Sequence, residues 1–223
     1  MDRTIKVTGK GKISVKPDTI RLIITQTNIE KNYEGAILES ADKKGNLSSA
    51  LAKIGFKSDA LKTLYFNVDT EYESYQAKDK SWKRRLNGYR YTHRMKLEFP
   101  SDNEMLGKVL LAVAHCPGQP EFTIQYTISD PERAKNELLA KAVEDSKAKA
   151  NVLSKAAGVM LKDILTIDYS WDEIDLVTRP VNDLMLRECC IEPDMDYESG
   201  IDLDIEVDDI DVTDTVTVVW EIG

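Results

Sequence analysis

Hydrophobic and polar residues alternate in the first part of the chain, as they do in β-strands. The alternation covers residues 4–7 and 13–29, with Gly9-Lys10-Gly11 between the two runs and Lys16-Pro17-Asp18 inside the second. In the second run Ile20, Leu22, Ile24 and Gln26 share one side of the predicted strand. The pattern therefore predicts a strand, a glycine-rich bend and further strand.

The period then changes to that of a helix. Residues of one helix face recur in alternating steps of four and three, at Tyr33, Ile37, Ser40, Lys44, Leu47, Leu51 and Ile54, and Gly55 ends the run. A second helix is predicted to begin at Ser101, which forms a capping box with Glu104, and to end before Cys116-Pro117-Gly118.

A third and longer helix is predicted after Asp130-Pro131-Glu132. These three residues supply an N-cap, a proline at the first helical position and an acid in the first turn. The helix is expected to run to Ala157 and to stop at Gly158.

Other strands follow from alternation outside the helices. Residues 64–72 and 89–99 are predicted to pair, and the polar connection 73–88, which contains Asn87-Gly88, is predicted to be a long mobile loop. Residues 122–128 and 161–170 are also predicted strands. Residues 212–222 are apolar on both sides, which is typical of a strand inside a sheet.

The resulting order is ββα-ββα-βα-ββ, which predicts an α+β fold with a mixed or antiparallel sheet covered by about three helices. Residues 1–223 are interpreted as a single domain, with two ββα subunits of one fold as an alternative. Residues 172–209 are predicted to form an acidic loop.

Composition agrees with a packed fold and limits the partners. The chain is 42% hydrophobic and 31% charged, with a formal net charge of −9. This charge argues against nucleic-acid binding, which requires clustered Lys and Arg. Lys83-Arg84-Arg85, between Trp82 and Tyr89, is compatible with an acidic partner or nucleic acid, but the net charge favours a solvated loop.

The predicted compartment is the cytoplasm. The first residues, Met1-Asp2-Arg3, are followed by no apolar run of signal-peptide length. No stretch approaches the roughly 20 apolar residues of a membrane helix, so no membrane span is expected. Three cysteines do not make a disulfide framework in a chain of this length.

Catalytic candidates are few. His93 on a strand and His115 at a helix end are the only histidines, and both are expected to have structural roles, His115 by offsetting the helix dipole. Cys116 lies beside His115, but a nucleophilic thiol would need a neighbouring base. Cys189-Cys190 lacks the spacing of zinc or thioredoxin-type sites.

Gly9-Lys10-Gly11-Lys12 resembles a phosphate-binding loop only superficially. Such a loop follows a strand and opens a helix, whereas this one is followed by more strand pattern. No catalytic residue and no cofactor are therefore predicted.

An acidic segment is the most unusual local feature. No Lys or Arg follows Arg187, while carboxylates accumulate at Glu188, Glu192, Asp194, Asp196, Glu198, Asp202, Asp204, Glu206, Asp208, Asp209, Asp211 and Asp214. A solvated acidic loop is the favoured interpretation. The alternatives are a basic protein partner or a divalent cation, because Ca²⁺ and Mg²⁺ prefer oxygen ligands. The weak metal candidates are Asp194, Asp196, Glu198, Asp202 and Asp204, whose spacing is not that of an EF-hand.

Several stretches together resemble the SIMPL-domain family, a group of unknown function. They are residues 5–18, residues 61–68, Asn87-Gly88-Tyr89, Ala148-Lys149-Ala150 leading to Gly158, and residues 212–220. The chain departs from the family at about residues 171–209. The resemblance implies an α+β fold, a tendency to self-assemble and loose links to oxidative stress or signalling, and it supplies no catalytic residues. Family members are often exported, whereas the absence of a leader here predicts a cytosolic member.

Two classes of function remain. The first is a non-enzymatic protein that forms a homo-oligomer through an apolar edge strand and a tyrosine-rich hairpin, with Tyr65, Tyr72, Tyr75, Tyr89 and Tyr91 at the contacts. The second is a protein that binds a small molecule or a divalent cation, or a hydrolase or redox enzyme whose site uses His93 or His115 with Cys116 and carboxylates from the acidic segment.

Overall fold

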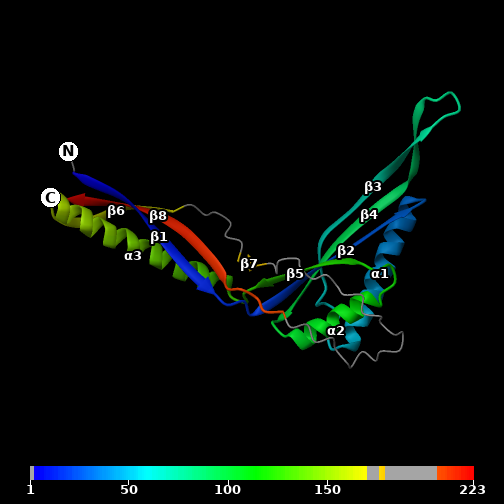
Figure 1. The fold of residues 1–223 in the computed structure, drawn as a ribbon, viewed down its shortest axis with the longest axis horizontal. Coiled ribbons are helices and arrows are strands. Elements are labelled where there is room, and N and C mark those ends of the chain that lie inside the picture. The colour runs from blue at the N-terminus through cyan, green and yellow to red at the C-terminus, as the bar shows by residue number, and fades with distance from the viewer. Residues whose placement is uncertain (1–2, 170–175, 179–204) are drawn as a thin grey trace. The chain divides into compact units, whose positions relative to one another are not determined.

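The computed structural model describes residues 3–169, 176–178 and 205–223 (Figure 1). Its elements are β1 (Thr4–Val15), β2 (Thr19–Glu30), α1 (Tyr33–Lys53), β3 (Lys62–Gln76), β4 (Trp82–Pro100), α2 (Asn103–Ala114), β5 (Glu121–Thr127), α3 (Pro131–Ala157), β6 (Leu161–Tyr169), β7 (Val177–Thr178) and β8 (Ile210–Ile222). The predicted α+β class and order of elements are confirmed. The strands form two antiparallel sheets.

The chain divides into two compact units. Among the described residues, unit 1 contains residues 3–18, 127–169, 176–178 and 207–223, and unit 2 contains residues 19–126 and 205–206. Unit 1 is thus assembled from the two ends of the chain and one internal segment.

Unit 1 contains a three-stranded sheet in the order β1-β8-β6. β8 lies in the centre and pairs antiparallel with both neighbours, so its prediction as an internal strand is confirmed. β1 pairs with β8 along its whole length, from Thr4 opposite Glu221 to Val15 opposite Ile210. One face of these strands carries the buried side chains, among them Val7, Val218 and Trp220.

α3 covers that face at very short range. Its buried residues recur every four positions, at Ala134, Leu138, Ala142, Ser146, Ala150 and Ser154. Its predicted limits are confirmed, because Asp130 is the N-cap and Gly158 (φ 68°) ends the helix in the left-handed region.

The glycine-rich bend predicted at Gly9-Lys10-Gly11 is wrong, because β1 is one continuous strand through these residues. A Cβ atom on Gly9 would lie 2.0 Å from the Ala142 carbonyl oxygen, and one on Gly11 would lie 2.2 Å from the Leu138 carbonyl oxygen. The glycines therefore permit the α3 backbone to contact the strand, which is a packing role and not a turning role.

Unit 2 contains the strand order β3-β4-β2-β5. β2 pairs antiparallel with β4 from Thr19 opposite Pro100 to Glu30 opposite Tyr89. The inward side of β2 is the predicted one, with Ile20, Leu22 and Ile24 fully buried. Tyr91, Met95 and Leu97 of β4 are buried beside them, so these residues form the core.

α1 and α2 complete this core. α1 begins after the N-cap Asn32, buries Ala36, Ser40, Leu47 and Leu51, and is followed by Gly55 at φ 100°. α2 begins after Asp102, whose side chain accepts from the backbone N–H groups of Glu104 and Met105. The N-cap of α2 is therefore Asp102 and not the predicted Ser101.

The mobile loop predicted over residues 73–88 is also wrong. β3 runs to Gln76 and β4 begins at Trp82, so only residues 77–81 form the turn. β2 pairs with β4 no further than Tyr89, and the hairpin continues beyond it as a two-stranded ribbon (Figure 1). We call residues 71–88 the arm.

Candidate functional site

A buried histidine connects three elements of unit 2. His93 follows Tyr91 on the inward side of β4 and is only 6% exposed. Its Nδ1 atom lies 3.0 Å from Ser40 Oγ of α1, and its Nε2 atom lies 2.9 Å from Thr63 Oγ1 of β3. The ring of Phe66 meets the imidazole edge-on at 5.2 Å. Helix and sheet are thus joined by a short hydrogen-bonded chain.

Burial, assisted by the charge of Lys44, lowers the pKa of His93. The imidazole is therefore neutral near pH 7, with one nitrogen that donates and one that accepts. Ser40 and Thr63 provide one partner for each nitrogen. A ring that is enclosed and fully bonded in this way stabilises the packing of α1 and has no open side for a substrate.

A second group of polar residues lies beside it, between α1 and β2. The Asn28 amide donates to both carboxylate oxygens of Glu39, at 2.8 and 2.9 Å, and Lys43 Nζ lies 2.9 Å from Glu39. Although burial alone raises the pKa of Glu39, the hydrogen bonds from Lys43 and Asn28 outweigh it and lower that pKa. The Lys43 ammonium also lies 5.6 Å from the centre of the Tyr91 ring. Burial raises the pKa of Tyr91.

Gln26 completes this polar seam, by which we mean Gln26, Asn28, Ser40, Thr63, His93, Glu39, Lys43 and Tyr91. Gln26 is 4% exposed, and its amide nitrogen lies 3.5 Å from the Lys43 carbonyl oxygen. Its position was visible in the sequence, because it follows Ile20, Leu22 and Ile24 on the inward side. The roles of Asn28, Glu39 and Lys43 were not predicted.

His115 and Cys116, the alternative catalytic residues, each form a hydrogen bond with the α2 backbone. His115 is the C-cap of α2, where it can offset the helix dipole, and its Nδ1 atom lies 2.8 Å from the Leu111 carbonyl oxygen. The Cys116 thiol is 6% exposed and donates to the Ala112 carbonyl oxygen at 3.2 Å. Burial raises the pKa of Cys116, which disfavours the reactive thiolate.

Among the described residues, two of the cavities have walls that contain neither histidine nor cysteine. One of about 330 Å³ lies in unit 1 at the start of α3, and its lining mixes Lys16 and Arg133 with Asp18, Asp130 and Glu137. Another of about 290 Å³ lies in unit 2 and is mostly apolar, with Phe56, Phe99 and Met105 in its wall.

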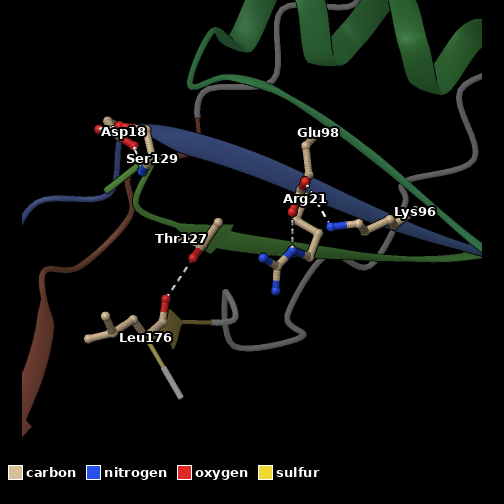
Figure 2. A network of polar contacts seen from close by, with 7 residues as sticks. All are labelled: Asp18, Arg21, Lys96, Glu98, Thr127, Ser129 and Leu176. Carbon is tan, nitrogen blue, oxygen red and sulfur yellow. Dashed lines mark hydrogen bonds and ion pairs between the residues drawn. The ribbon is translucent and has the colours of Figure 1, made fainter. Parts of the chain in front are cut away.

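Polar contacts at and beside β2, β4 and β5 account for several of the charged residues (Figure 2). In unit 1 the Asp18 carboxylate accepts from the Ser129 backbone N–H at 2.6 Å and from its hydroxyl at 2.7 Å, and Thr127 donates to the Leu176 carbonyl oxygen. In unit 2 the Glu98 carboxylate binds Arg21 at 2.6 Å and Lys96 at 2.9 Å. These contacts fix the ends of strands and supply no acid–base pair.

The basic run predicted in a loop lies on β4, within the arm. Arg84 stacks on the Tyr72 ring at 5.0 Å and Arg85 on the Tyr75 ring at 5.4 Å. Arg85 also forms an ion pair with Glu73 across the ribbon. Of the five tyrosines predicted at contacts, Tyr65, Tyr72 and Tyr75 are exposed, whereas Tyr91 is in the core.

The metal candidates Asp194, Asp196, Glu198, Asp202 and Asp204 lie outside the described residues, as do Cys189 and Cys190. Within the described residues no group of three or more His, Cys, Asp or Glu is placed to hold a metal ion. Further along the acidic segment, Glu206, Asp208 and Asp209 are exposed in the irregular stretch before β8, and Asp211 pairs with Lys12 at 3.3 Å.

β6 forms an edge of the unit 1 sheet and is unusually apolar for an exposed strand. Ile164, Ile167 and Tyr169 pair with Trp220, Val218 and Val216 of β8, which are buried under α3. α3 lies over β1 and β8 and scarcely reaches β6. The three β6 side chains therefore remain 42–47% exposed.

In the part of the chain that the structure describes, no helix is both long and apolar enough to cross a membrane. The architecture is that of an α+β protein with two helix-covered antiparallel sheets, whose histidines are held by structural hydrogen bonds. The family model described as SIMPL, protein of unknown function (DUF541), matches residues 5–220, so the chain belongs to the SIMPL family. A comparison with curated proteins found no match.

Proposed function

We propose that this SIMPL-family protein is non-enzymatic and works as a homo-oligomer, in which β6 forms the main contact between subunits. The observation that carries the proposal is the exposed apolar face of β6, made by Ile164, Ile167 and Tyr169. Among the described residues, the outer edge of β6 has no paired strand. An edge of this kind invites pairing with another chain unless charges or a cover protect it.

The opposite edge of the same sheet supports this choice. The exposed side of β1 carries Lys6, Lys10 and Lys12, residues that discourage edge-to-edge pairing. β6 has charges at Lys162, Asp163 and Asp168 but none between Ile164 and Ile167. Its centre is therefore the less protected edge of the unit.

A static light-scattering measurement over a range of concentrations tests the proposal. The wild-type chain is expected to have at least twice the monomer mass, and Ile167→Lys is expected to lower that mass substantially, because a lysine would lie at the centre of the contact. Val152→Lys is the matched control. Val152 is also an exposed apolar residue, at 68%, but it lies on α3 and outside the proposed contact. A monomer at every concentration would refute self-association. Loss of assembly in both variants would remove β6 as its cause.

We propose further that the protein acts in the cytoplasm, on the support of three cysteines without a disulfide framework. Cell fractionation would test this location. The link to stress or signalling rests on family resemblance alone. Binding of a small molecule remains an alternative, and the mixed-charge cavity at the start of α3 is the place where a ligand screen would look for it.

A further inference from the structure

The arm of unit 2 presents two faces of different chemistry. Cross-strand pairing places Glu73 opposite Arg85 and Tyr75 opposite Lys83 on one face. The other face holds the pairs Tyr72–Leu86, Ser74–Arg84 and Gln76–Trp82. We call Tyr72, Trp82, Arg84 and Leu86 the aromatic face.

The aromatic face has the composition of a binding surface. Trp82 is 73% exposed, and Tyr72 and Leu86 are 47% and 48% exposed. Tryptophan, tyrosine and arginine are the residues most enriched at the energetic centres of protein interfaces. A two-stranded ribbon outside a sheet has no core of its own to bury such side chains. Their exposure therefore favours a partner over a folding role.

The arm is held in a defined shape that can present this face. At its base a Cβ atom on Gly88 would lie 2.4 Å from the Glu30 carbonyl oxygen, so the glycine lets β2 close against the ribbon. At its tip the Ala77 N–H donates to the Ser81 carbonyl at 2.8 Å, and Asp79 accepts from the Ser81 hydroxyl at 2.6 Å. Ordered ends reduce the conformational entropy that binding would cost.

Charge indicates the kind of partner. Arg84 is stacked on Tyr72 and is the single charged residue of the aromatic face. Residues 78–85 carry five basic residues and one acid, Asp79, in a chain whose net charge is −9: Lys78, Lys80, Lys83, Arg84 and Arg85. The basic arm of an otherwise acidic protein is complementary to an acidic segment and not to a second basic surface.

The same chain contains a segment of matching chemistry. Glu206, Asp208 and Asp209 are exposed in the stretch before β8, and Ile205 and Val207 alternate with the acids. No Lys or Arg occurs after Arg187 to reduce its negative charge. A segment that alternates apolar and acidic side chains is complementary to a face that combines aromatic rings with one arginine.

We propose that the aromatic face of the arm binds the acidic stretch 205–209 of a second copy of this chain. The proposal rests on the self-association proposed above and names a second contact in it. Because different surfaces of the two copies meet, the contact is head-to-tail, and it extends an assembly beyond what β6 pairing alone would give.

Sedimentation velocity can test this contact separately from β6, in chains that carry Ile167→Lys so that the β6 contact is removed. In this background we expect a residual, concentration-dependent association that weakens at least tenfold when NaCl is raised from about 0.05 M to about 0.5 M. Arg84→Glu is expected to weaken it at least tenfold, whereas Lys57→Glu, the same charge change at an exposed site of unit 2, is expected to change it less than twofold.

A mixing experiment then identifies the partner surface. In the same Ile167→Lys background, the Arg84→Glu chain and the Asp208→Arg/Asp209→Arg chain should each associate poorly alone. An equimolar mixture of the two should recover a dimer, because one intact face and one intact acidic stretch remain. Circular dichroism of each variant should match the wild type. No recovery in the mixture would overturn the proposal, as would Arg84→Glu behaving like Lys57→Glu. If Arg84→Glu instead abolished binding of a labelled DNA duplex without changing self-association, the face would belong to another partner. Failure of this contact with β6-dependent assembly intact would leave the proposed function standing.

Discussion

The two units join a helix to a sheet in opposite ways. In unit 1, α3 meets β1 through small residues and bare backbone, so that Gly9 and Gly11 lie against the Ala142 and Leu138 carbonyls. In unit 2, α1 covers its sheet over a polar seam centred on His93. The first contact depends mainly on close fit, although the Lys10 N–H also donates to the exposed Asp145 of α3 at 2.7 Å. The second depends on the protonation state of a buried histidine. The two units should therefore respond to different perturbations.

The largest expected effect is steric and belongs to unit 1. Gly9→Val would place side-chain atoms on the backbone of α3, which cannot retreat without opening the core, and we expect a loss of about 3 kcal/mol or more in unfolding free energy. Chemical denaturation followed by circular dichroism measures it.

Gly45 provides the matched control for that substitution. A Cβ atom there would meet nothing within 4 Å, in the middle of α1. Gly45→Ala is therefore expected to stabilise the chain by about 0.5–1 kcal/mol through helix propensity. Equal losses at the two glycines would show that close packing on β1 is not the cause.

The next effect is electrostatic and belongs to unit 2. The pKa of His93 is lowered from 6.5 in the folded state, so the unfolded chain binds the proton first as pH falls. Stability is then complete above about pH 6.5 and declines below it, by at most about 1.4 kcal/mol per pH unit, until the folded pKa is reached.

Denaturation curves between about pH 7.5 and about pH 5.5 measure this decline, above the range where carboxylates titrate. His93→Gln keeps polar atoms at the site but does not titrate, and its stability should vary less over the same interval. An identical slope in both proteins would assign the pH dependence to other groups.

A smaller effect should follow from removing one hydroxyl of the seam. Ser40→Ala leaves one nitrogen of a buried imidazole without its partner, and we expect a loss of about 1 kcal/mol. Ser49→Ala removes a hydroxyl from the exposed side of the same helix, where it only bonds the Gly45 carbonyl. This control should lie within about 0.5 kcal/mol of the wild type. Thermal or chemical denaturation of the two variants in parallel gives the difference.

The smallest effect is expected on the surface of unit 2. Arg21→Gln breaks the ion pair with Glu98, which still keeps Lys96 at 2.9 Å. Partly exposed pairs of this kind contribute little, and we expect a change of about 0.5 kcal/mol or less that disappears in high salt. A loss as large as that of Ser40→Ala would show that surface charges stabilise this unit as much as the seam does.

Features that depend on neighbouring residues could be predicted from the sequence. Asp130, Pro131 and Gly158 set the ends of α3 through local backbone chemistry, and both ends were predicted correctly. The inward side of β2 was likewise visible in its alternation, including the polar Gln26.

Features that depend on residues far apart in the chain could not be predicted from the sequence. Gly9 and Gly11 looked like a bend because their role is defined by α3, more than a hundred residues further along the chain. The arm looked like a loop because its polar residues are held by pairs across the ribbon, such as Arg85 with Glu73. The seam joins Ser40, Thr63 and His93 from three separate elements, and no local pattern reports that meeting.

The pairing of β1 with β8 has a consequence for biosynthesis. Thr8 and Thr217, whose hydroxyls lie 3.0 Å apart, are separated by 209 positions in the chain. On the ribosome β1 emerges early and must wait for its partner until almost all of the chain has been made, while residues 19–126 can already fold. Ribosome stalling before residue 210 would leave an alternating, strand-forming segment without its hydrogen-bond partners, and this is the nascent state most in need of a chaperone.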